Sequence, residues 1–118
     1  LTDSNKKIKI RLAGIDTPER KQSFGDTAKN ALAKLVFHKK ILIETQTKDR
    51  YGRTVGMVFL DNLNVNNELV RQGMAWVYRK YTDNEILYEL EAQAKTRRIG
   101  LWADETPIAP WDWRRGKR

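Results

Sequence analysis

Apolar residues along this chain change their spacing from every second residue to every third or fourth residue, and then back again. Residues 8–15 read IKIRLAGI, in which Ile8, Ile10 and Leu12 alternate with other side chains, as in a half-buried strand. Residues 25–38 place alanine, leucine and valine three and four positions apart, which predicts an amphipathic helix. A chain that contains both periods so close together is expected to combine strands and helices in one small structure.

The same alternation of patterns continues toward the C-terminus. Further elements are expected as strands at 41–47, 55–60 and 74–78 and as helices at 66–72 and 82–98. The segment DRYGR at 49–53 predicts a hairpin turn, because Gly52 can adopt positive φ. Thr82 and Glu85 have the spacing of a capping box, so the last helix is expected to begin at Thr82.

The end of the chain follows a different pattern, with two prolines and three tryptophans in LWADETPIAPWDWRRGKR. We expect an extended tail that its indoles hold on the body, with the terminal RRGKR exposed to solvent. A length of 118 residues supports one domain. The expected organisation is therefore a single domain at 1–118, within which 103–118 form a packed C-terminal tail.

The charge of the chain favours a polyanionic partner. The net charge is +8, and residues 1–60 carry 13 basic and 6 acidic side chains. No apolar run reaches 18 residues, so no membrane span is expected. The absence of cysteine excludes disulfides and thiolate metal sites.

Ionisable residues gather where the first predicted strand ends. Arg11 lies on the strand, Asp16 and Glu19 follow it, and Arg53 comes directly after the hairpin turn. Phosphodiester cleavage requires a base for the attacking water, fixed cations for the phosphoryl oxygens, and often a hard metal ion held by oxygen ligands. The four side chains together have the chemistry for all three tasks.

Each of these residues also has an ordinary structural explanation. Thr17, Pro18 and Glu19 have the composition of a helix or turn start. Arg11 suits an exposed strand face, and Arg53 suits a turn residue that pairs with Asp49. Spacing alone leaves these alternatives open.

Six stretches of the chain occur in a familiar order: RLAGIDTPE (11–19), DRYGR (49–53), NELVRQGMAWVY (67–78), EAQAK (91–95), GLW (100–102) and PWDWR (110–114). Together they resemble the staphylococcal nuclease, or thermonuclease-like, family. The resemblance implies an α+β fold, a small five-stranded OB-type β-barrel with three helices. It also implies a calcium-dependent, sugar-nonspecific endonuclease that hydrolyses phosphodiester bonds of DNA and RNA and leaves 3′-phosphates.

The resemblance further implies a role for individual positions. It implies that Arg11, Glu19 and Arg53 are catalytic, that Asp16 and the carbonyl of Thr17 hold Ca²⁺, and that Arg50, Tyr51, and Tyr78 or Tyr81 bind the substrate. Arg50 stands where the type member of the family has lysine. The segment RKY at 79–81 permits either tyrosine as the residue near the base.

One part of the family pattern is missing. The family has an Asp-Gly-Asp-Thr stretch on its first strand, upstream of the strand arginine, and its second aspartate is a calcium ligand. Counting back from Arg11 passes the start of these 118 residues, so the first strand is expected to be missing from the given chain. Asp3 is a poor substitute for the missing ligand.

Three functions remain open on this basis. The first is the nuclease, the second is a non-catalytic nucleic-acid-binding OB-type module, and the third is a protein-interaction copy of the fold. The presence of Arg11, Glu19 and Arg53 together favours the nuclease. The expected partners are DNA and RNA, single-stranded or locally opened, with no membrane, and the expected state is a monomer. Family resemblance alone implies a secreted or periplasmic protein.

Overall fold

Short strands and helices alternate along the chain, as the changing apolar period predicts. The computed structural model describes residues 2–3, 6–7, 9–37, 39–80 and 82–116. The strands are β1 (Thr2–Asp3), β2 (Lys6–Lys7), β3 (Ile10–Leu12), β4 (Ile15–Asp16), β5 (Leu42–Lys48), β6 (Thr54–Leu60), β7 (Leu63–Asn64) and β8 (Trp76–Val77). The helices are α1 (Gly25–Val36), α2 (Val65–Arg71), α3 (Glu85–Arg97), the 3-10 helix η1 (Gly100–Ala103) and α4 (Pro110–Arg114).

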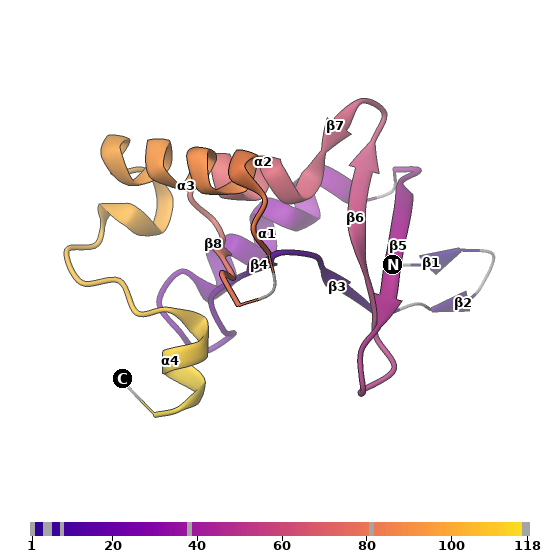
Figure 1. The fold of residues 1–118 in the computed structure, drawn as a ribbon, viewed down its shortest axis with the longest axis horizontal. Coiled ribbons are helices and arrows are strands. Elements are labelled where there is room, and N and C mark those ends of the chain that lie inside the picture. Colours follow the sequence, from indigo (N-terminus) through magenta and orange to yellow (C-terminus); the bar gives the residue numbers. More distant parts are fainter. Residues whose placement is uncertain (1, 4–5, 8, 38, 81, 117–118) are drawn as a thin grey trace.

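The main sheet has β6 in its middle. β5 pairs with β6 in antiparallel fashion through the predicted hairpin, and β3 pairs with the other side of β6 in parallel. The short β7 returns along the end of β6. The parallel pairing sets Arg11 opposite Val55, so the first part of the chain lies directly beside the strand that follows the hairpin (Figure 1).

A glycine turn divides the strand predicted at 8–15 into β3 and β4. Gly14 has φ +75°, and a Cβ at this position would lie 3.0 Å from the side chain of Leu87. The turn needs glycine because both its left-handed backbone and the nearby side chain disfavour any other residue. Beyond the turn, β4 leaves the main sheet and pairs with β8, with Asp16 opposite Trp76. Arg11 and Asp16 therefore belong to different sheets on either side of one tight turn.

Helix α2 lies at the centre of the core. Its Val65, Leu69 and Val70 are fully buried. They join a cluster that is completed by Ile15, Val58, Ala75, Val77 and Leu87. The cluster thus unites residues from both sheets with residues of α2 and α3, which fixes β4 relative to β6.

A buried asparagine in α2 joins the ends of two strands. The Nδ2 group of Asn66 donates to the carbonyls of Ala13 at 3.1 Å and Gly56 at 3.3 Å. Its Oδ1 accepts the amide of Val58 at 3.1 Å. Asn66 therefore satisfies buried backbone groups where β3 ends beside β6, at the start of the turn that leads to Asp16.

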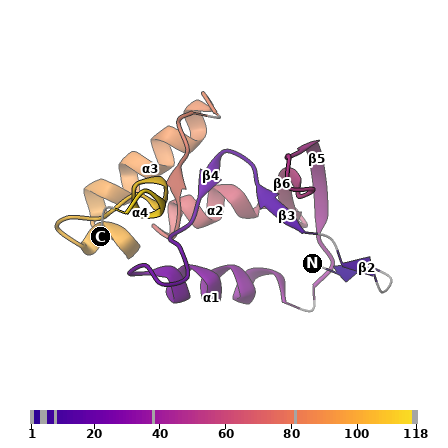
Figure 2. The ribbon, with the colours of Figure 1, turned by 90° about the horizontal axis from the view of Figure 1, so that it is seen from below.

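The tail differs from the extended segment that we expected, because residues 110–114 form α4. Pro110 is at the first helical position, where its fixed φ suits a helix and its missing N–H costs nothing. Helix α4 lies beside the β4–β8 pair, at the end of the molecule opposite the β5–β6 hairpin (Figures 1 and 2). It adds a fourth α-helix, in the described part of the chain, to the three that were expected.

The predicted cap of α3 is wrong. The cap is Asn84, whose side chain accepts the amide of Ile86 at 2.9 Å. The hydroxyl of Thr82 instead accepts the amide of Asn84 at 3.1 Å. Both residue types bind nearby backbone amides readily, so the chain forms two short side-chain turns in succession before the helix begins.

The α+β fold class is confirmed. The described strands belong to three sheets, made of β1 and β2, of β3, β5, β6 and β7, and of β4 and β8, without a closed barrel among them. The pairing of β3 with β6 and the turn at Gly14 are the features that place the candidate site.

Candidate active site

Arg11 and Arg53 lie on the same face of the main sheet. Arg11 is opposite Val55, and Arg53 immediately precedes β6. The amide of Thr54 donates to the carbonyl of Lys9 at 2.8 Å, which carries the parallel pairing to the start of β6. Because side chains two positions apart on a strand share a face, this register directs both arginines to one face.

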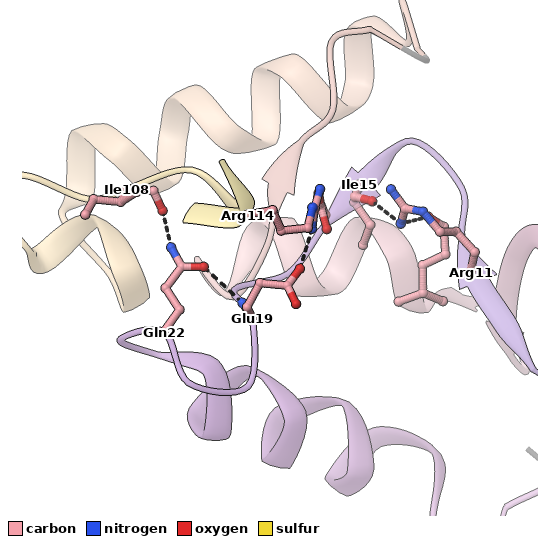
Figure 3. Close-up of polar contacts among 8 residues, drawn as sticks. Arg11, Ile15, Glu19, Gln22, Ile108 and Arg114 are labelled. Atoms are coloured by element: carbon pink, nitrogen blue, oxygen red, sulfur yellow. Dashed lines mark hydrogen bonds and ion pairs between the residues drawn. The ribbon is translucent and has the colours of Figure 1, made fainter. Parts of the chain in front are cut away.

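Arg11 reaches across the turn between β3 and β4. Its Nη1 donates to the carbonyl of Ile15 at 2.9 Å, and its guanidinium carbon lies 5.8 Å from the centre of the Tyr78 ring (Figure 3). These contacts fix the half-buried side chain beside β4. They leave Nη2 and Nε of the guanidinium as donors for a ligand.

The β5–β6 hairpin holds Arg53 through Asp49. The Nε of Arg53 donates to Oδ2 of Asp49 at 2.6 Å, and Oδ1 accepts the backbone amides of Tyr51 and Arg53, each at 2.9 Å. Burial raises the pKa of Asp49, but the bonds from Arg53 and Tyr51 outweigh it and hold this pKa below its ordinary value of 3.8. The pairing of Arg53 with Asp49, which the sequence left open as an alternative to a catalytic role, is therefore present.

Tyr51 and Arg50 complete the hairpin. Tyr51 is 69% exposed, and the guanidinium carbons of Arg50 and Arg53 lie 5.1 and 5.7 Å from the centre of its ring. Two guanidinium groups thus flank an exposed aromatic face. Such a group of side chains offers both stacking and charge to a nucleotide.

The carboxylates of Asp16 and Glu19 converge on Arg114, which belongs to α4. The Nη2 of Arg114 donates to Oδ2 of Asp16 at 2.6 Å. Its Nη1 donates to Oε1 of Glu19, as Figure 3 shows. Asp16 is only 7% exposed, whereas Glu19 is half-buried. The bond to Asp16, and with it the bond to Glu19, raises the pKa of Arg114 above its ordinary value against the opposing effect of burial.

Helix α4 reaches this position through aromatic contacts. Trp111 stacks on Tyr78, with ring centres 4.9 Å apart and planes 15° apart. It also meets Trp76 edge to face at 5.6 Å, and Trp76 meets Trp102 at 4.5 Å. Arg114 is three residues after Trp111 and so shares its side of the helix. The packing of the indoles therefore holds α4 in an orientation in which Arg114 faces β4.

The turn after β4 is tied to the tail by a second contact. Gln22 is buried, its Oε1 accepts the amide of Glu19 at 3.0 Å, and its Nε2 donates to the carbonyl of Ile108 (Figure 3). Thr17 lies half-buried between Asp16 and the buried Pro18. The helix start considered at Thr17 does not occur, because α1 begins at Gly25 after a series of turns.

The predicted site residues thus form two groups joined by the β3–β6 pairing. One contains Arg11, Asp16, Thr17, Glu19 and Tyr78, and the other contains Arg50, Tyr51 and Arg53. Tyr81 lies outside the described residues. In the part of the chain that the structure describes, no ion pair joins Arg11 or Arg53 to Glu19. The ion pairs of Asp16 and Glu19 in this part of the chain are instead with Arg114, and that of Arg53 is with Asp49.

Two residues of the site were not predicted. Arg114 was expected in an exposed terminus, and Gln22 had no expected role. A helix start at Pro110 could have indicated a role for Arg114, because it places Trp111 and Arg114 one turn apart on a short helix. Nothing in the sequence indicated that this helix would reach residues almost a hundred positions earlier.

The carboxylate oxygens near β4 are of the kind that binds a hard cation. The carboxylates of Asp16 and Glu19 already bind one cationic group together, and oxygen ligands of this type suit calcium. Within the described residues, however, no group of three or more histidine, cysteine or acidic side chains could hold a metal. A cation at this place would therefore need ligands besides these two side chains, and it would meet Arg114 there.

Helices in the described ranges are too short or too polar to cross a membrane. The family model described as "Staphylococcal nuclease homologue" matches residues 9–104. An "Uncharacterized endonuclease" of Haemophilus influenzae is 45% identical over 118 residues, which are 100% of this chain and 66% of the relative.

Two further relatives come from another bacterium and from a plant. A "Micrococcal nuclease" of Shigella flexneri is 41% identical over 123 residues, which cover 94% of this chain and 70% of the relative. The "Staphylococcal-like nuclease CAN1" of Arabidopsis thaliana is 41% identical over 113 residues, or 96% of this chain and 35% of the relative. The chain thus spans about two thirds of the two bacterial relatives and about one third of the plant protein. By the match to its family model and by these identities, the chain belongs to the staphylococcal nuclease family.

Proposed function

We propose that the protein is a nuclease that hydrolyses phosphodiester bonds of DNA and RNA without sugar specificity. The observation that carries this proposal is the shared sheet face of Arg11 and Arg53, next to the turn that presents Asp16 and Glu19. The endonuclease and nuclease names of the relatives support it. The finer proposal is calcium-dependent cleavage that leaves 3′-phosphates, on single-stranded or locally opened substrate, by a monomer.

The two arginines are proposed to bind the scissile phosphate. Arg53 donates to Asp49 only through Nε, so its two Nη groups remain able to form parallel bonds to two phosphate oxygens. Arg11 likewise retains Nη2 and Nε. The negative charge on the phosphoryl oxygens grows as water attacks, and fixed guanidinium groups stabilise that charge more in the transition state than in the ground state.

Glu19 is proposed to accept the proton of the attacking water. The water oxygen forms a bond to phosphorus, and the bond from phosphorus to the 5′ oxygen breaks. That oxygen takes a proton from solvent, which leaves a 3′-phosphate and a 5′-hydroxyl. For this role Glu19 has to exchange its bond with Arg114 for a bond to water.

Asp16 and the carbonyl of Thr17 are the proposed ligands of the calcium ion. When bound, the ion would supply additional neutralisation of phosphate charge. Asp16 suits the position because it is held in β4, opposite Trp76, with its carboxylate directed toward a cationic group. Tyr51, Arg50 and Tyr78 are proposed to contact the neighbouring nucleotides.

The test is cleavage of plasmid DNA, single-stranded DNA and RNA by the full-length protein in calcium, magnesium or chelator. Arg53→Lys and Glu19→Gln should each lower the rate by roughly 10² to 10³ while the unfolding transition is retained. Arg97→Lys, on the exposed side of α3, is the matched control and should cut at the wild-type rate. End-group analysis by mass spectrometry should find 3′-phosphates.

If the protein is instead a non-catalytic binding module, none of these substrates should be cleaved. This alternative is supported by the bond between Glu19 and Arg114, which occupies the proposed base. Binding of single-stranded DNA without cleavage in any metal would establish the module and refute the nuclease. Wild-type rates in both Arg53→Lys and Glu19→Gln would refute the assigned residues.

A further inference from the structure

Arg114 occupies the place of a cation between two carboxylates of the candidate site. Its two terminal nitrogens are divided between them, with Nη2 on Asp16 and Nη1 on Glu19 (Figure 3). These are the carboxylates that the proposed function needs for the calcium ion and for the base. One side chain from the end of the chain therefore satisfies both groups at once.

We propose that Arg114 and a divalent cation exclude each other at Asp16 and Glu19, so that the ion pairs of Arg114 and a cation-loaded site are alternative states. The inference rests on the proposed function, because it concerns the cation used there. On this proposal, Arg114 of α4 competes with the metal ion for the two carboxylates.

The first support is electrostatic. Asp16 is 7% exposed, and a carboxylate so deeply buried needs a compensating charge nearby. The Arg114 guanidinium supplies that charge in the ion-paired state, and a divalent ion would supply it in the other state. With both present at the same two carboxylates, the guanidinium and the ion would repel each other, and water would screen that repulsion least beside the buried Asp16.

The second support is access. The side chains of Arg114 and Glu19 are 42% and 37% exposed, so solvent reaches the pair from the Glu19 side. An ion can therefore approach without unfolding the protein. The ion pair with Glu19 has this exposure and contributes little to stability, so an arriving ion can replace that half of the Arg114 contact first.

The third support is the separate anchoring of α4. Trp111 packs against Tyr78 and Trp76, and Gln22 bonds to Ile108 just before the helix. These contacts keep α4 near β4 even when the ion pairs break. Arg114 therefore remains at high local concentration beside the carboxylates, which lets a single side chain compete with a dissolved ion.

The experiment measures calcium binding by titration calorimetry on the full-length protein and its variants. Arg114→Gln should bind calcium at least about tenfold more tightly, since hydrogen bonds between charged groups are worth more than this ratio requires. Arg114→Lys keeps the charge without the two-pronged geometry and should fall between Arg114→Gln and wild type. Arg115→Gln removes the same charge from the adjacent exposed residue and should match wild type.

A second readout follows from reciprocity, because a metal that displaces Arg114 from the carboxylates is itself displaced by Arg114. Calcium should speed the hydrogen exchange of the amides of Arg115 and Gly116 in the wild-type protein, because their bonds to the carbonyls of Asp112 and Trp113 span Arg114 and loosen when it is released. The proposal is overturned if Arg114→Gln binds calcium no more tightly than Arg115→Gln, or if calcium slows or does not change this exchange. Absence of calcium binding in every variant also overturns it.

Cleavage assays on the same variants separate the two proposals. Tighter calcium binding by Arg114→Gln, without cleavage by any variant, refutes the nuclease and keeps the competition. Calcium-dependent cleavage with equal calcium affinity in Arg114→Gln and Arg115→Gln keeps the nuclease and refutes the competition.

Discussion

The carboxylate of Asp49 binds Arg53 twice, through the backbone amide and through Nε of the side chain. The same carboxylate accepts the amide of Tyr51, so one residue shapes the hairpin and aims the arginine that follows it. An arginine held through Nε presents its outer nitrogens in a fixed direction. Asp49 is therefore a positioning residue for the proposed phosphate contact.

Asp49→Asn should reduce cleavage without unfolding the protein. The amide oxygen still accepts the backbone bonds, but the charged partner of Arg53 is lost. Displacement of a catalytic group by about 1 Å can cost on the order of 10², so kcat/KM is expected to fall roughly 10- to 100-fold. Steady-state kinetics on single-stranded DNA check this. Asp83→Asn, at an exposed position, should retain wild-type values, and equal kinetics in both variants would show that Asp49 does not position Arg53.

Stability should depend on the ionisation of Asp49 at low pH. Its pKa in the folded protein lies below the ordinary value of 3.8, so its ionised form stabilises the fold above about pH 4. This contribution is lost as the pH falls through the folded pKa. The unfolding free energies of wild type and Asp49→Asn, measured by denaturant titration, should differ at neutral pH and converge at pH values below the folded pKa. A difference that stays constant with pH would contradict the assignment.

Asn66→Ala should destabilise the protein by about 3 kcal/mol, because it leaves the buried amide of Val58 and the carbonyl of Ala13 without their partner. Chemical denaturation measures the change. Asn30→Ala removes the same side chain from an exposed position on α1 and should change stability by less than about 0.5 kcal/mol. If both variants lost a similar unfolding free energy, the buried hydrogen bonds of Asn66 would not stabilise the fold.

Trp111→Ala should release α4 from the body. The stack on Tyr78 and the edge contact with Trp76 disappear, with a loss of about 2 kcal/mol in unfolding free energy. Proteolysis within 103–116 should become faster than in wild type. Ile86→Ala truncates an apolar side chain that is 58% exposed and serves as the control. Unchanged proteolysis of the tail in Trp111→Ala would show that other contacts hold the helix.

Segments with a clear period were predictable from the sequence. The alternation around Ile10 and Leu12 gave β3, and the three-and-four spacing gave α1 within two residues of its observed ends. The hairpin at 49–53 followed from one glycine. Local patterns record which side of an element is buried, and these elements bury one side each.

Contacts between distant residues were not predictable in the same way. The division of 8–15 at Gly14 depends on Leu87 lying against the turn, and the sequence near Gly14 does not contain that information. The bond of Arg114 with Asp16 depends on how Trp111 packs against Tyr78 and Trp76. Aromatic residues in a proline-rich tail predict burial, but they do not specify the surface on which it occurs.

The bond between Asp16 and Arg114 spans 98 positions, so its two halves leave the ribosome at different times. Synthesis at about 5 to 20 residues per second separates them by roughly 5 to 20 s. During that interval β4 can already pair with β8, while the carboxylate opposite Trp76 has no guanidinium to meet. A nascent chain therefore passes through a stage in which this acidic pair is uncovered, and the pair is closed only when Arg114 has been synthesised.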